Sequence, residues 1–168
     1  MTATELVKKE CLRRINESHE KIISSLAGFT QEEIWWRPNP ASNSMGNIIL
    51  HLCGNLTQYV LSSLGGWPDQ RQRSMEFEEQ GPVPVKELFD KLEEVMRNVN
   101  ETIHACNDYE LMRVRPVQCF EESGIGILIH VTEHLSYHTG QIVYFVKWKT
   151  GKSMHFYDGV DLEARGEG

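Results

Sequence analysis

The sequence predicts an all-α fold, a four-helix bundle, from three observations. Four segments carry apolar residues at steps of three and four, which is the period of an amphipathic helix. Stretches rich in glycine, proline or charge separate these segments. No segment shows the sustained apolar–polar alternation that is typical of a half-buried strand. At 168 residues the chain fits one domain, and we expect the bundle in residues 1–150 and a polar tail in residues 151–168.

The first predicted helix covers residues 4–26, and Gly28 is expected to end it. Its apolar stripe comprises Leu6, Val7, Cys11, Leu12, Ile15, Ile22, Ile23 and Leu26. Residues 31–44 follow, and we expect them to form a loop because Pro38 and Pro40 interrupt any helix there.

The second predicted helix runs from about Met45 to Leu64. Asn43 or Ser44 can cap its first turn, and the pair of glycines after Leu64 can end it. Residues 65–83 are rich in Gly, Pro and charge, which predicts a long connection that contains at most a helical turn.

The last two predicted helices cover about 85–107 and 123–149. The first of them has one apolar stripe: Leu88, Leu92, Val95, Met96, Val99 and Ile103. The segment between the two helices is irregular, with a locally extended stretch expected at residues 113–120.

Composition narrows the possible partners and the compartment. The net charge of −7 and the pI of 5.5 argue against a nucleic-acid or anionic-membrane partner, which would favour a basic surface. The sequence has neither a secretory signal nor an apolar run near the roughly 20 residues of a membrane span. The four cysteines are scattered without a CxxC pair, which suits a reducing compartment, so we expect a cytoplasmic protein.

The stretch HVTEHLSYHTGQIVYF places His130, His134 and His138 at four-residue steps in the last helix. Residues four apart on a helix lie about 6 Å apart along the axis and on one face, so two such imidazoles can share a metal ion. Residues eight apart are separated by about 12 Å, which is too far. The spacing therefore allows the pair His130/His134 or the pair His134/His138.

The second helix offers a third ligand. His51 lies among apolar residues where a bundle helix packs, and its ring needs a polar partner there. A metal ion shared with the last helix would supply that partner, and three imidazoles would leave a coordination position open, as catalytic sites do.

Simpler interpretations stay open from spacing alone. A lone His on an apolar helix is more often a core residue that has a hydrogen-bond partner than a ligand. Asn47 and Asn55 can be interpreted as the exposed side of the second helix. Glu133 can be interpreted as a charged side chain in solvent. Cys53 is expected in the core. Trp35 and Trp36 are expected to close one end of the core. His19, His104 and His155 receive no role.

Taken together, EEIWWRPNPASNSMGNIILHLCGNL and HVTEHLSYHTGQI resemble the DinB-like superfamily of YfiT-like metalloenzymes over nearly the whole chain. The resemblance implies a four-helix bundle in up-down-down-up order, often as a homodimer. It also implies a metal triad of His51, His134 and His138. The family often has Arg where this chain has Thr139, which leaves the metal ligands unchanged but alters what can dock beside them.

The resemblance implies a divalent metal ion, with zinc or nickel suited to imidazole ligands. Similar proteins include S-transferases and isomerases that use bacillithiol, mycothiol or glutathione. We therefore expect a metal-dependent enzyme of the thiol S-transferase kind, acting on a small thiol and an electrophile. The alternatives are a metal-dependent hydrolase and a non-catalytic, stress-associated metal-binding protein.

Overall fold

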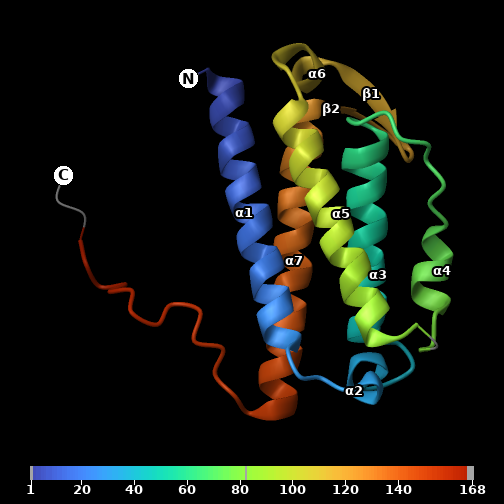
Figure 1. Ribbon diagram of the computed structural model, residues 1–168, viewed down its shortest axis with the longest axis vertical. Helices are drawn as coiled ribbons and strands as arrows, with labels where there is room; N and C mark the ends of the chain where they lie inside the picture. Colours follow the sequence, from blue (N-terminus) through green and yellow to red (C-terminus); the bar gives the residue numbers. More distant parts are fainter. Residues whose placement is uncertain (1, 82, 166–168) are drawn as a thin grey trace.

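The computed structural model describes residues 2–81 and 83–165 (Figure 1). Four long helices lie side by side, which confirms the predicted all-α four-helix bundle: α1 (Ala3–Leu26), α3 (Met45–Leu56), α5 (Val85–Ala105) and α7 (Gly124–Thr150). A π-helical segment, η1 (Thr57–Ser62), continues α3. The shorter elements are α2 (Gln31–Trp35), α4 (Arg73–Glu78), α6 (Asp108–Met112), β1 (Val114–Val117) and β2 (Phe120–Ser123).

The apolar stripes predicted from the sequence meet in one core between the long helices. α1 packs along α7, and α3 packs along α5 and α7. The side chains at the centre are fully buried, among them Ile15, Ile22, Leu52, Leu92 and Val131. Burial of each such side chain is worth about 1.5–3 kcal/mol. Cys53 also lies in this core, as expected.

The helices α3 and α5 run in the same direction, upward in Figure 1, whereas α1 and α7 run downward. Two neighbouring parallel helices require a connection that travels back along the bundle. Residues 63–81, called here the crossover segment, lie on this return path, and α4 forms within them and packs against α3. The crossover segment is thereby held beside the middle of α3.

One sequence interpretation needs correction, and the structure extends another. Residues 31–44 are not a continuous loop, because α2 forms there with a capping box between Thr30 and Glu33. The prolines limit this helix to one short stretch instead of abolishing it. The extended stretch near 113–120 is one strand of a regular antiparallel hairpin, in which Val114 pairs with Ser123 and Val117 with Phe120.

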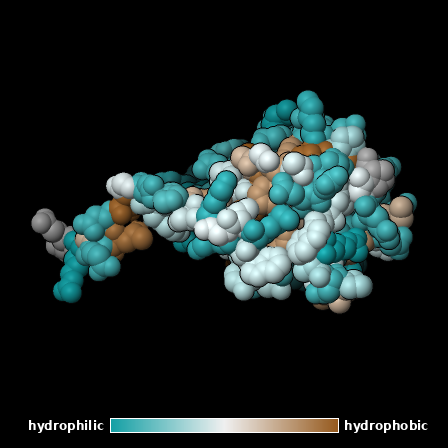
Figure 2. Space-filling view, turned by 90° about the horizontal axis from the view of Figure 1, so that it is seen from below, coloured by the Kyte–Doolittle hydropathy of each residue, from teal (hydrophilic) through white to brown (hydrophobic). Residues whose placement is uncertain are grey.

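The chain leaves the bundle after α7, where Gly151 ends the helix with a φ of 67°. Residues 151–165 form neither helix nor strand and extend to one side of the bundle (Figures 1 and 2). Met154 still packs against the core, and the ammonium group of Lys21 on α1 lies near the rings of Phe156 and Tyr157. Within the described ranges, none of the helices combines the length and the apolar character that a membrane span needs.

Ser44 is the N-cap of α3 and is fully buried. Its hydroxyl accepts the backbone N–H of Asn47 at 3.1 Å and donates to the side-chain oxygen of Asn47 at 2.6 Å. We expect Ser44→Ala to lower the free energy of unfolding by about 1–2 kcal/mol, because buried polar groups lose their partner. Urea unfolding measures this loss. Ser136→Ala on the exposed face of α7 is the control, with an expected change below about 0.5 kcal/mol. Equal losses in the two variants would contradict the role of the cap.

Candidate metal centre

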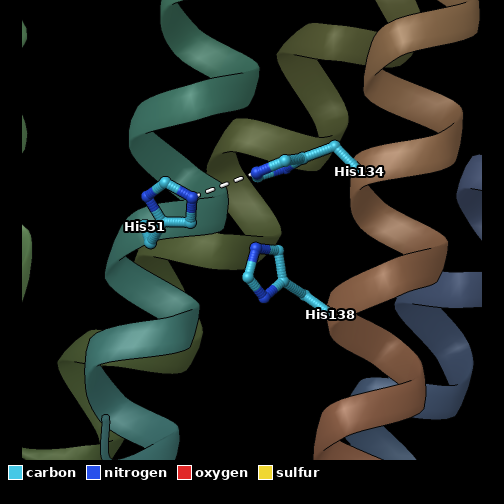
Figure 3. A group of neighbouring side chains, drawn as sticks. All are labelled: His51, His134 and His138. Carbon is cyan, nitrogen blue, oxygen red and sulfur yellow. Dashed lines mark hydrogen bonds between the residues drawn. The ribbon is translucent and has the colours of Figure 1, made fainter. Parts of the chain in front are cut away.

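Three histidines from two helices converge in the space between α3 and α7 (Figure 3). His51 comes from α3, and His134 and His138 come from successive turns of α7. The Nε2 atoms of His51 and His134 are 3.0 Å apart. One ligand atom from each of the three residues lies within 4.8 Å of the others. The three residues named by the resemblance are therefore together, in an arrangement compatible with a metal site.

Two of the three rings have the Nδ1 atom anchored by an oxygen. The Nδ1 atom of His51 lies 2.8 Å from Oε2 of Glu76, and that of His138 lies 2.8 Å from Oε1 of Gln141. Both oxygens accept hydrogen bonds, so each Nδ1–H donates and each Nε2 keeps its lone pair. Such outer hydrogen bonds fix the tautomer and the orientation of metal-binding imidazoles.

Glu76 is held in place from the crossover segment. Its carboxylate accepts hydrogen bonds from Nε of Arg71 at 2.7 Å and from Nη2 at 3.0 Å. The side-chain amide of Asn47 donates to the backbone oxygen of Glu76 at 2.9 Å. A side chain at Gly54 would collide with this carboxylate, so the glycine leaves room for Glu76 against α3.

Burial disfavours the charged form of the two rings that α7 contributes to the cluster. Burial, strengthened by the neighbouring rings of His138 and His51, lowers the pKa of His134 to about 3. Burial also lowers the pKa of His138 and of His130. Burial alone would raise the pKa of Glu76, but hydrogen bonds from His51 and Arg71 outweigh it and hold that pKa below its usual value. Neutral imidazoles are the protonation state that metal ligation requires.

His130 lies outside the cluster, one turn earlier on α7. Its ring stacks on Tyr59 with the ring centroids 4.1 Å apart, and its Nε2 atom lies 3.2 Å from the amide nitrogen of Asn55. The interpretation of Asn47 and Asn55 as an exposed file is wrong, because both are buried. They lie on the side of α3 that faces the crossover segment and α7. Glu133 is exposed, as expected.

The partners of the cluster were missed from the sequence. Arg71 and Glu76 belong to a segment predicted only as a polar connection, where no spacing distinguishes Glu76 from Glu78 or Glu79. Gln141 could have been predicted as a partner of His138, since it follows His138 by three residues and so lies on the same helix face. Thr139, which replaces the family's Arg, is buried and donates to the backbone oxygen of Leu135.

Acid is expected to destabilise the metal-free protein between pH 6.5 and 4.5, the ordinary pKa values of His and Glu. In this window the unfolded chain protonates His134 and the folded chain does not, so the free energy of unfolding falls as the pH falls, by up to about 1.4 kcal/mol per pH unit. Glu76, with its depressed pKa, contributes stability that is lost only at lower pH.

Urea unfolding of chelator-treated protein across this window measures the pH dependence. His134→Gln removes the titrating ring and is expected to give a shallower dependence than the wild type. The same slope in both proteins would contradict the burial of a neutral His134.

Comparison with known families supports the fold and the resemblance. A family described as "Protein of unknown function (DUF1572)" matches residues 2–156. No curated protein matches the chain.

Three solved structures share the fold at low sequence identity. A conserved protein from Enterococcus faecalis is 18% identical with a TM-score of 0.67, and the match covers 90% of this chain and 99% of that one. A DinB-like protein, YjoA, from Bacillus subtilis is 14% identical with a TM-score of 0.62, covering 88% and 94%. A protein from Streptococcus pneumoniae is 15% identical with a TM-score of 0.64, covering 84% and 90%.

These matches span nearly the whole bundle, and the DinB-like protein shares the fold of this chain. The chain belongs to the DUF1572 family.

Proposed function

We propose that His51, His134 and His138 bind one divalent metal ion, zinc or nickel, and that the protein is a metal-dependent enzyme acting on a small thiol. The observation that carries the proposal is the convergence of three imidazoles, two of them with Nδ1 anchored and Nε2 left as a ligand atom. Imidazole ligands suit both metals.

The ligand set favours a catalytic over a structural site. Among the described residues, the three histidines are the one group of His, Cys, Asp and Glu that is close enough to share an ion. Structural zinc sites have four protein ligands, whereas catalytic sites have three and leave a position for water or substrate. When bound, a divalent ion at such a position supplies Lewis acidity, which lowers the pKa of a coordinated thiol or water.

The surroundings favour a thiol over water as the nucleophile. Glu76 is already engaged by His51 and Arg71, and the Nε2 atom of His130 accepts from Asn55, so neither is free to act as a general base. A thiol ionises near pH 8.5 and water near 15.7, so a thiol needs far less help in losing its proton. With both of these groups engaged, the site fits a thiol S-transferase better than a hydrolase.

The resemblance of the motifs to the DinB-like superfamily suggests bacillithiol, mycothiol or glutathione as the natural class of thiol, with a small electrophile as second substrate. The net charge of −7 is consistent with no nucleic-acid partner. A homodimer and a cytoplasmic location remain predictions of the sequence.

Metal analysis of the tag-free protein tests the proposed triad. We expect about one zinc or nickel ion per chain in the wild type, and loss of that ion in His51→Ala, His134→Ala and His138→Ala. His155→Ala is the matched control, because His155 is exposed in the tail and should leave the metal content unchanged. Circular dichroism checks that each variant remains helical. Retention of the ion in His134→Ala would refute the triad.

Glu76→Gln is expected to weaken metal binding about 10–100-fold, because the carboxylate that orients His51 becomes a neutral amide. Competition with a chromogenic chelator measures the dissociation constant. Glu78→Gln is the control on the same short helix, since Glu78 is exposed. Equal affinities in the two variants would exclude the orienting role of Glu76.

Thiol-dependent conjugation of a chromogenic electrophile tests the activity. Metal-loaded protein is expected to accelerate the reaction, and His134→Ala to abolish the acceleration. Stoichiometric metal binding without acceleration for any thiol in a panel would contradict the transferase. Ester or amide hydrolysis in its place would identify the hydrolase.

A further inference from the structure

We propose that a groove directly below the histidine cluster binds an uncharged aromatic group of the substrate. The proposal rests on the proposed function, because it names the class of substrate that reaches the same site. The groove has a volume of about 480 Å³ and lies between the start of α3 and the end of α7. That volume is in the range of small-molecule sites.

The groove adjoins the cluster on both helices. Ile48 lines it one turn before His51 on α3, and Gln141 lines it one turn after His138 on α7. One turn is about 5.4 Å along the axis. Gln141 belongs to both features, since its Oε1 atom accepts the hydrogen bond from Nδ1 of His138. A molecule that reacts at the histidines can therefore extend into the groove.

The lining defines the chemistry of the ligand. Its apolar walls are formed by Met45, Ile48, Tyr144, Phe145 and Trp148. None of the described residues that line the groove carries a formal charge. A charged group would leave water there without gaining a countercharge, which is costly, whereas an aromatic ring gains contact with other rings.

The aromatic wall is pre-positioned. The rings of Trp148 and Trp36 stack with centroids 5.9 Å apart, and Phe145 lies 5.7 Å from Trp36. The ammonium group of Lys149 sits over the Trp36 ring at 4.8 Å. Trp148 nevertheless stays 61% exposed and Tyr144 74% exposed. Large rings held in place at the edge of a hollow are typical of a ligand site.

A second cavity of about 580 Å³ does not compete for this assignment. It lies behind the crossover segment and is lined by Arg71, Glu76, Glu79 and Lys91 among others. Its charged walls and its position on the far side of Glu76 separate it from the Nε2 atoms of the cluster.

Calorimetric titration of zinc-loaded protein tests the groove with two thiols, of which only one carries an aromatic ring. We expect benzyl mercaptan to bind about tenfold more tightly than 2-mercaptoethanol, since the ring is removed from water. Trp148→Ala is expected to abolish most of that preference while zinc affinity stays unchanged. Tyr144→Ala is a second variant, and Tyr109→Ala, 70% exposed on α6, is the control that should keep the preference.

The outcomes separate the groove from the metal centre. If the protein binds zinc but shows no preference for benzyl mercaptan, the groove proposal is wrong and the proposed function stands. The same holds if Trp148→Ala and Tyr144→Ala both retain the preference. If the protein does not bind zinc, the proposed function is wrong. Titration of the metal-free protein with toluene then tests whether the groove binds an aromatic ring. A saturable shift of the indole N–H signal of Trp148, assigned from its loss in Trp148→Phe, supports the groove, and no shift overturns it.

Discussion

The rest of the site depends on one constraint, which is the burial of the His51 imidazole on the largely apolar helix α3. A buried ring with two polar nitrogens is costly unless both find partners. Glu76 occupies one nitrogen, and the other faces the two histidines of α7. The first contact alone would make His51 an ordinary core histidine. The second contact brings His134 to the same place, and with His138 beside it the three rings form a cluster that could hold a cation.

The course of the chain explains how Glu76 reaches this position. Because α3 and α5 run side by side in the same direction, the chain has to return along the bundle, and the crossover segment lies beside α3 on that path. Arg71 and Glu76 are neighbours there and arrive together as an ion pair, which offsets part of the cost of burying the carboxylate. The groove between α3 and α7 remains free of charge on its walls. The histidines thus lie between the Arg71–Glu76 ion pair on one side and an uncharged groove on the other.

Most of the fold could be predicted from local sequence patterns. The end of α1 before Gly28 and the start of α3 after Ser44 follow from glycine and cap chemistry that acts over a few residues. The helix α2 could have been found from its Thr30–Glu33 capping box, which the nearby prolines overshadowed. Spacing alone left two histidine pairs open, and the resemblance to a family selected His134 and His138. The roles of Arg71 and Glu76 lay beyond sequence reasoning, because they depend on the path of the crossover segment and not on any local period.

The central claim is that one ion is shared by His51, His134 and His138. Anomalous diffraction from a crystal of zinc-loaded protein, recorded on both sides of the zinc absorption edge, tests it most directly. The account predicts one strong peak per chain, within about 2.0–2.1 Å of a nitrogen from each of the three rings and with no fourth protein ligand. A peak elsewhere, for instance at His155 and Asp158 in the tail or at the exposed Cys119, with none between α3 and α7 would contradict it.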